Sequence, residues 1–221
     1  MENGHSFTFG TAALVARASG ALFWPARRLL VVSDLHLGKS ERMARRGGAL
    51  LPPYEVTDTL RRLEAEIQET APDHVICLGD SFDDLAAARS LDSDARAWLT
   101  RLVAQASWTW ITGNHDPAPV GLGGQTAEAL TLGPLTFCHM ATDAARYEVS
   151  GHYHPKAALR VRGRPISRPC FLRDASRLIL PAYGTYTGGL RSTDPALANL
   201  MGADARAILA GQPMVEIPMP R

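Results

Sequence analysis

One stretch, residues 29–38 (LLVVSDLHLG), constrains the fold of this chain more than any other. Four apolar residues ending in two valines predict a short buried β-strand. Asp34 and His36 follow this strand, and side chains at positions i and i+2 of an extended chain project to the same side. A carboxylate oxygen and a neutral imidazole nitrogen at one point are good ligands for a divalent transition metal. The stretch therefore predicts part of a metal site.

The same pattern, a short apolar strand followed by a metal-competent side chain, recurs four more times. These strands are expected at residues 75–78, 108–112, 135–138 and 147–150. The side chains that follow them are Asp80, Asn114 with His115, His139, and His152 with His154. Loops at the carboxyl ends of neighbouring strands can aim several ligands at one point. Five of the seven histidines stand at these positions, so the sequence predicts a ligand cluster.

Each of these motifs also has an ordinary structural alternative. An Asp-x-His pair is often two polar residues after a strand, and a Gly-Asp pair is often a turn. Gly113-Asn114 suits a turn with the asparagine in a left-handed conformation. Two histidines at i and i+2 beside Gly151 are harder to explain by packing. Because every motif follows a predicted strand, structural roles alone explain the whole set poorly.

The remaining segments are assigned from their apolar periodicity. Apolar residues at helical spacing predict helices at residues 55–70 and from 92 or 93 to about 106. We expect β structure through residues 6–38 with a hairpin turn at 18–20, and a glycine-rich loop at 182–189. Near the end of the chain we expect a short helix at about 204–210 and an edge strand at 214–217.

The composition is that of an ordinary globular protein and excludes intrinsic disorder. The chain has 221 residues, of which 46% are hydrophobic and 20% charged, and we expect a single domain over residues 1–221. No apolar run approaches the roughly 20 residues that cross a bilayer, and the N-terminus lacks a signal-peptide pattern. Three scattered cysteines predict no disulfides. We therefore expect a cytoplasmic protein with no membrane partner.

In their order, the polar motifs of the chain resemble those of the calcineurin-like metallophosphoesterases. These motifs are Asp34-x-His36, Gly79-Asp80, Gly113-Asn114-His115-Asp116, His139 and Gly151-His152-x-His154. The resemblance implies an α/β (α+β) fold of two packed mixed β-sheets flanked by helices, a metallophosphoesterase-like sandwich. It also implies two divalent ions, one held by Asp34, His36, Asp80 and His154, the other by Asp80, Asn114, His139 and His152. The general acid implied by the resemblance is His115.

The residue types suit this chemistry. Two cations roughly 3.5–4 Å apart can bind both an attacking water and the non-bridging oxygens of a phosphate ester. The leaving oxygen needs a proton, which an imidazole can supply, and a charged imidazole needs an orienting carboxylate. Asp83 matches the Gly-Asp-x-x-Asp spacing of the family and is the predicted partner of His115, with Asp84 and Asp116 as competitors. Four histidine ligands favour Mn²⁺, although Fe, Zn or Mg ions also tolerate mixed nitrogen and oxygen ligands.

Residues beyond the ligands are similar to one bacterial branch of that family, the ligase-associated DNA damage response endonucleases. The similarity lies in residues 34–53, 169–172, 181–184 and 186–190. It implies a DNA endonuclease acting in repair on single-stranded or end structures, and association with an ATP-dependent DNA ligase and a helicase. Asp83 departs from this branch, in which we expect a histidine at that position.

Two other functions stay open at this point. The first is a pyrophosphatase or phosphodiesterase acting on a small nucleotide or a nucleotide-lipid. The sequence has no obvious inserted lid for a lipid substrate, which counts mildly against a nucleotide-lipid. The second is a catalytically inactive metal-binding scaffold in a repair complex. The complete ligand set and the presence of His115 argue against an inactive scaffold.

Although the net charge is only +1, the chain contains two basic segments that suit a polyanionic substrate. Residues 39–46 carry four basic residues and one acid, and residues 156–177 carry seven basic residues and one acid. Both segments directly follow predicted ligands, and the candidate substrate-binding residues are Lys39, Arg45, Arg46 and Lys156. Such residues bind backbone phosphates without reading sequence. The alternative is that they pair with carboxylates of the protein. Tyr183 and Tyr186 are candidates for stacking on bases, or for simple packing.

Overall fold

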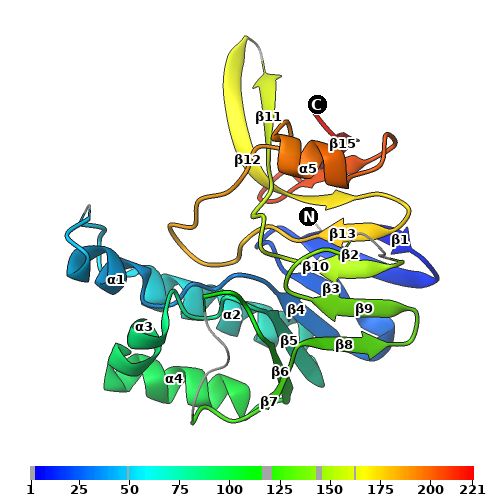
Figure 1. Cartoon of the computed structure of the whole chain (residues 1–221). Helices are drawn as coiled ribbons and strands as arrows, with labels where there is room; N and C mark the ends of the chain where they lie inside the picture. The colour runs from blue at the N-terminus through cyan, green and yellow to red at the C-terminus, as the bar shows by residue number, and fades with distance from the viewer. Residues whose placement is uncertain (1–2, 49, 116–120, 143–145, 162) are drawn as a thin grey trace.

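The structure is a computed structural model that describes residues 3–48, 50–115, 121–142, 146–161 and 163–221. Two mixed β-sheets pack face to face, and helices cover their outer faces (Figure 1). This is the two-sheet sandwich that the sequence motifs implied. In the part of the chain that is described, no helix has both the length and the apolar character needed to span a bilayer.

The first sheet joins an antiparallel half to a parallel half. Within the described residues its strands follow chain order: β1 (Gly4–Phe9), β2 (Ala12–Arg17), β3 (Leu22–Trp24), β4 (Leu29–Val32), β5 (His74–Leu78), β6 (Ser107–Ile111) and β7 (Gln125–Ala127). The pairs from β1 to β4 are antiparallel, and those from β4 to β7 are parallel. The carboxyl ends of β4, β5 and β6 therefore meet at one edge.

The second sheet has its own parallel core. Its order is β15 (Val215–Pro218), β14 (Arg206–Leu209), β12 (Arg164–Arg173), β13 (Arg177–Ile179), β10 (Glu148–Ser150), β9 (Leu135–Cys138) and β8 (Ala129–Leu132). Strand β10 runs parallel to both β9 and β13. The additional strand β11 (Lys156–Val161) pairs with β12, and the two form a hairpin that projects from the body of the molecule (Figure 1).

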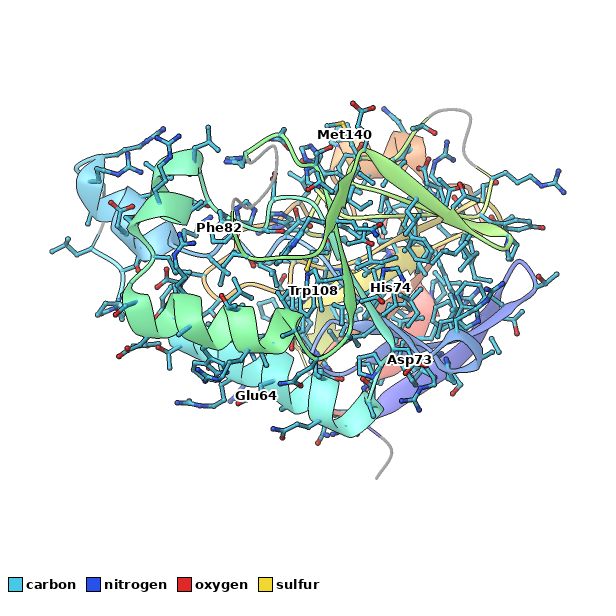
Figure 2. All side chains as sticks on the ribbon, turned by 90° about the horizontal axis from the view of Figure 1, so that it is seen from below. Glu64, Asp73, His74, Phe82, Trp108 and Met140 are labelled. Atoms are coloured by element: carbon cyan, nitrogen blue, oxygen red, sulfur yellow. The ribbon has the colours of Figure 1, made fainter. Side chains whose placement is uncertain are left out.

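Helices α2 (Glu55–Thr70) and α4 (Ser93–Val103) cover the first sheet. Helix α5 (Pro195–Leu200) covers the second sheet. The 3-10 helix η1 (Pro25–Arg27) connects β3 to β4, while α1 (Lys39–Arg45) and α3 (Leu85–Ser90) pack together beyond the strand ends (Figure 1). In Figure 2, side chains that include Phe82 and Trp108 fill the layer between the helices and the first sheet.

Alternation along each strand divides the core into three layers. On β4, Leu29 and Val31 face the second sheet, whereas Leu30 and Val32 face α2 and α4. On β12, Phe171 points into the layer between the sheets, and its neighbours pack beneath α5. A strand with apolar residues on both faces must lie in the interior, and β4 is buried over its whole length.

Most of the elements expected from periodicity are confirmed, including the helix at residues 55–70 and the hairpin around 18–20. The expected helix near 204–210 is wrong, because residues 206–209 form β14. Ala207, Ile208 and Leu209 are buried between β12 and β15, and this burial outweighs the helix propensity of an alanine-rich segment. Helices α1, α3 and α5 and strands β7 and β8 were not expected from the sequence.

Candidate metal centre

All seven predicted ligands lie in the loops that follow five strands at one edge of the sandwich. Asp34 and His36 follow β4, Asp80 follows β5 and Asn114 follows β6. His139 follows β9, while His152 and His154 follow β10. The parallel cores of the two sheets bring these strand ends together, the usual location of sites in α/β folds.

Backbone strain is concentrated among these residues. Nine described non-glycine residues have positive φ, and five of them are predicted ligands: Asp34 (53°), His36 (44°), Asp80 (46°), His152 (69°) and His154 (47°). Side chains with a Cβ rarely adopt this left-handed conformation, and such strain typically marks functional sites. At Gly151, an added Cβ would lie 1.7 Å from Ser33 Oγ, so glycine allows the close approach of the loops that follow β10 and β4.

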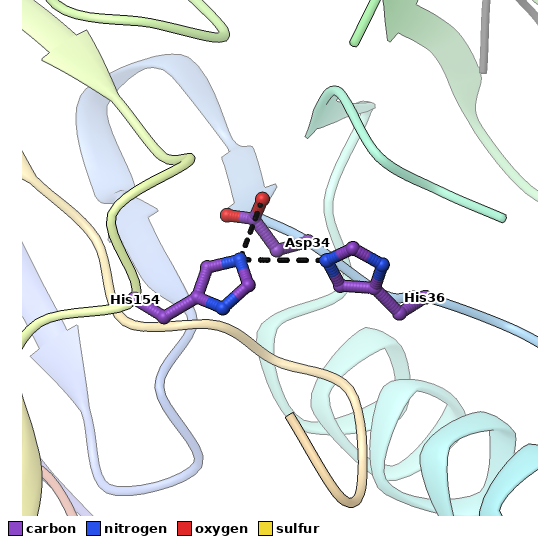
Figure 3. A group of neighbouring side chains, drawn as sticks. All are labelled: Asp34, His36 and His154. Carbon is purple, nitrogen blue, oxygen red and sulfur yellow. Dashed lines mark hydrogen bonds and ion pairs between the residues drawn. The ribbon is translucent and has the colours of Figure 1, made fainter. Parts of the chain in front are cut away.

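Asp34, His36 and His154 form the first group of candidate ligands (Figure 3). Nε2 of His154 lies 3.0 Å from Oδ1 of Asp34 and 3.4 Å from Nε2 of His36. The other oxygen of Asp34 accepts hydrogen bonds from Ser33 Oγ (2.5 Å) and the amide of His152 (3.0 Å). Asp34 Oδ1 is buried and faces the imidazole nitrogen of His154, an arrangement that would suit a metal ligand.

Asp80, His139 and His152 form the second group, with Asn114 beside them. Nε2 of His139 lies 2.9 Å from Oδ1 of Asn114 and 3.2 Å from Nδ1 of His152. The amide of His115 donates to Oδ1 of Asp80 (2.9 Å). Oδ2 of Asp80 lies 3.5 Å from His139 Nε2 and 3.9 Å from His36 Nε2, and therefore lies between the two groups.

Partners behind the imidazoles fix which nitrogen faces the centre. Nδ1 of His139 lies 2.8 Å from the carbonyl oxygen of Leu78, and Nδ1 of His36 lies 2.9 Å from Oδ1 of Asp83. Each acceptor holds a proton at Nδ1, which leaves the lone pair of Nε2 for a metal. This arrangement of neutral imidazole nitrogens and carboxylate oxygens fits a divalent transition metal.

Two pKa shifts agree with that donor set. Burial opposes ionisation of Asp34, but contacts with His154, His139 and Ser33 outweigh burial and hold the pKa of this carboxyl below its usual value. Burial, together with the neighbouring His139, lowers the pKa of His152 below its usual value. An ionised carboxylate and a neutral imidazole are the forms that bind metal.

The contacts of His115 differ from those expected. Its Nδ1 lies 3.0 Å from the backbone carbonyl oxygen of Asp83, whereas the Asp83 carboxylate contacts His36 and Nη1 of Arg42 (2.8 Å). His115, His36 and Asp83 form a third cluster of possible metal-binding atoms behind the first group. Burial opposes ionisation of Asp83, but His36, Arg42 and Lys39 lower the pKa of its carboxyl well below the usual range.

The other two candidate partners of His115 are Asp84 and Asp116. Asp84 accepts a hydrogen bond from the amide of Ala87 (2.7 Å) and begins helix α3. Its carboxylate also binds the arginines of α1. Asp116 lies outside the described residues.

The candidate substrate-binding residues fall into two environments. Three of them, in or just after helix α1, face carboxylates: Lys39 lies 3.6 Å from Asp83, and Arg45 and Arg46 lie 2.8 and 3.8 Å from Asp84. Lys156, at the start of β11, pairs with no carboxylate among the described residues, and its Nζ lies 3.5 Å from the carbonyl oxygen of Thr187. The α1 cations thus match the alternative of internal pairing, although the Arg46 side chain keeps 61% of its surface exposed.

Sequence patterns missed Ser33 and Arg42, which contact Asp34 and Asp83. Arg42 lies in the basic segment, but its partner is 41 residues away, and no local spacing indicates such a pair. Ser33 is next to Asp34 in the sequence, but only the structure shows that its hydroxyl donates a hydrogen bond to the Asp34 carboxylate. The two remaining histidines lie elsewhere: His5 contacts Glu216, and His74 lies next to Asp73 at the start of β5 (Figure 2).

Comparisons with known proteins agree with this geometry. Residues 27–182 match the family described as Calcineurin-like phosphoesterase. The crystal structure of Pseudomonas putida nuclease MPE matches with a TM-score of 0.76 and 31% identity, over 97% of this chain and 100% of that one. Yfce, a phosphoesterase from E. coli, matches with a TM-score of 0.42 and 14% identity, over 87% of this chain and 99% of that one, a similarity too weak to support any conclusion. No match was found among curated proteins.

A two-sheet sandwich with clustered carboxylate and imidazole ligands at its strand ends defines a metallophosphoesterase. The family match covers more than half of the sequence, and the nuclease resembles it over almost its whole length. The chain belongs to the calcineurin-like phosphoesterase family and is an enzyme that hydrolyses phosphate esters with divalent metal ions.

Proposed function

We propose that this enzyme is a DNA endonuclease that uses two divalent cations and acts in DNA repair. The observation that supports two cations rather than one is the location of Asp80, whose Oδ2 lies within 4 Å of an imidazole nitrogen of each ligand group. A carboxylate with a second oxygen held by the His115 amide is suited to a bridging role. DNA is proposed because the nuclease from P. putida is similar over the whole chain and because cations flank the ligand loops.

In this proposal, the first cation would be held by Asp34, His36, Asp80 and His154. The second would be held by Asp80, Asn114, His139 and His152. Cations bound there supply positive charge to the phosphate oxygens and lower the pKa of coordinated water. We expect Mn²⁺, because four imidazole nitrogens suit a borderline transition metal better than Mg²⁺, which prefers oxygen ligands.

His115 is the proposed general acid. Its Nδ1 faces the Asp83 carbonyl oxygen, an acceptor that holds a proton at this nitrogen. Nε2 is then the atom that would carry the proton for the leaving oxygen of DNA. The carbonyl orients the ring, so in this proposal Asp83 acts on His115 through its backbone and on His36 through its carboxylate.

The remaining proposals rest on the sequence, and the partner proteins among them on the resemblance alone. We place the enzyme in the cytoplasm and expect it to act together with an ATP-dependent DNA ligase and a helicase. Copurification of these proteins with the chain from a cell lysate would support the association. Lys39, Arg45, Arg46 and Lys156 are proposed to bind substrate phosphates.

The test of the proposed function is a cleavage panel with protein reconstituted in Mn²⁺. The substrates are circular single-stranded DNA, bis(p-nitrophenyl) phosphate, p-nitrophenyl phosphate and a nucleotide-lipid. Linearisation of circular DNA, which has no ends, is the expected result and requires an endonuclease. Preference for the nucleotide-lipid would support the pyrophosphatase alternative. Failure on every substrate, with metal bound, would support an inactive scaffold.

A further inference from the structure

A cavity of about 370 Å³ opens beside the candidate metal centre. His154 lines this cavity and also contacts Asp34, so the cavity and the ligand cluster share a wall. The other walls come from distant parts of the chain, namely the turn at residues 18–20, Arg62 of α2, Lys156 of β11, Arg168 and Pro169 of β12, the segment 181–188 and residues 210–211. The volume is within the usual range for a small-molecule site.

Of the three cations that line the cavity, Arg62 pairs with Asp58, whereas Lys156 and Arg168 retain unused hydrogen-bond donors and face no carboxylate among the described residues. Arg168 donates through Nε and Nη2 to the carbonyl oxygen of Ala210, and through Nη1 to that of Pro213 (3.0 Å). Neither Arg168 nor Lys156 pairs with a carboxylate anywhere in the described chain. A guanidinium has five N–H donors and an ammonium has three, so each side chain can still bind an anion. The carbonyl contacts of Arg168 also hold its guanidinium in place before a ligand arrives.

The segment 181–188 joins this cavity rigidly to the ligand loops. The amide of Tyr183 donates to the carbonyl oxygen of Ser33, and the amide of Gly184 donates to that of Asp34. Just beyond, a Cβ at Gly189 would lie 2.1 Å from the backbone oxygen of His154, so the chain packs directly on this ligand. Tyr186 lines the cavity with φ of +62°, an unfavourable conformation for an aromatic residue and a mark of functional constraint.

We propose that this cavity is a subsite for the nucleotide next to the scissile phosphate. Lys156 and Arg168 would hold the phosphate of that nucleotide, while Tyr186 and the prolines of the wall, Pro169 and Pro181, would contact its sugar and base. Cations beside apolar and aromatic surface match a nucleotide, whereas a free anion needs only the cations. The assignment rests on the proposed function, because it needs a phosphodiester at the neighbouring metal centre.

Calorimetric titration of the metal-free, full-length protein tests this subsite directly. The probes are thymidine 3′,5′-bisphosphate and inorganic phosphate. We expect the bisphosphate to bind at least about tenfold more tightly than phosphate, since it adds a second phosphate and a nucleoside. Equal affinity for the two probes would overturn the assignment to a nucleotide.

Lys156→Gln is the informative variant, because among the described residues the Lys156 side chain makes one long hydrogen bond, to the carbonyl oxygen of Thr187 (3.5 Å). Its loss should weaken bisphosphate binding about tenfold, the value of one charge-assisted hydrogen bond. Arg164→Gln is the matched control, since Arg164 is an exposed cation on the same hairpin that does not line the cavity. It should change the affinity by less than about twofold. Equal losses in the two variants would overturn the subsite.

A kinetic measurement separates failure of the subsite from failure of the proposed function. The quantity is kcat/KM for a thymidine trinucleotide divided by kcat/KM for bis(p-nitrophenyl) phosphate, measured in Mn²⁺. Lys156→Gln should lower this ratio about tenfold, as in the binding experiment. If DNA is cleaved and the ratio matches that of Arg164→Gln, the subsite is wrong although the function holds. If the wild-type protein cleaves no DNA, the proposed function is wrong.

Discussion

Replacing Asp83 by asparagine should lower both the free energy of unfolding and the affinity for metal. The Asp83 side chain is fully buried, and its carboxylate contacts Nδ1 of His36 (2.9 Å), Nη1 of Arg42 (2.8 Å) and Nζ of Lys39 (3.6 Å). Asp83→Asn keeps the shape of the side chain but removes the negative charge. Two effects follow, one on the free energy of unfolding and one on the imidazole of His36.

Removing one partner of a fully buried ion pair costs about 3–5 kcal/mol. The Arg42 and Lys39 side chains keep 21% and 20% of their surface exposed, so water relieves part of that cost. We therefore expect the free energy of unfolding to fall by about 2–3 kcal/mol, which lowers Tm by roughly 4–12 °C for a chain of this size. Replacing the charged acceptor at His36 Nδ1 by a neutral amide should weaken metal binding by about 10–100-fold.

The control is Asp84→Asn, the same change one residue away. Asp84 binds Arg45 at the surface and begins helix α3, a position that asparagine also fills well, so the cost should stay below about 1 kcal/mol. Thermal unfolding of the metal-free protein gives the stability, and titration with Mn²⁺ gives the affinity. If Asp83→Asn weakens metal binding no more than Asp84→Asn does, the Asp83 carboxylate does not orient His36.

Four further predictions concern the metal ions, the acid and the cations. Elemental analysis after reconstitution should find close to two divalent ions per chain. Asp80→Asn should lose metal from both positions, because the Asp80 carboxylate lies between the two groups of candidate ligands. If the protein holds one ion and the variant binds it equally well, Asp80 does not bridge two ions. Metal-stripped protein should regain more activity in Mn²⁺ than in Mg²⁺, and full activity in Mg²⁺ alone would contradict the imidazole-rich ligand set. His115→Ala should keep its metal and slow DNA cleavage by roughly 10²–10⁴-fold, but slow a nitrophenyl diester much less, because nitrophenolate leaves without a proton; His139→Ala should instead lose metal and fail on both substrates. Replacing Arg45 and Arg46 by glutamine should lower the salt-dependence slope of DNA binding by roughly 1.4–1.8 if each contacts one phosphate, whereas an unchanged slope would mean that both serve only Asp84.

The clustering of the candidate ligands could be predicted because its information is local. Each ligand follows a short apolar strand, and such strands are recognised from a few consecutive residues. Because β4 and β5 are parallel neighbours, the residues that follow them, Asp34 and Asp80, lie at the same edge of the sheet. The residues that would hold the metals, and the sandwich that supports them, were therefore accessible from motif order and strand pattern.

The contacts behind those ligands were decided by the tertiary structure. Helix α1 places Arg42 beside Asp83, and the carboxylate consequently faces His36 while only the carbonyl oxygen reaches His115. Hydrogen-bond direction depends on side-chain rotamers and on neighbours that are about 40 residues away in sequence, which spacing does not encode. The tertiary structure also decided strand β14, because burial between β12 and β15 outweighed a local helix preference. The cavity beside His154 likewise exists only where segments around residues 19, 156, 168 and 186 meet in space. Sequence alone determined which side chains can bind metal, whereas long-range packing decided what orients them and what lies next to them.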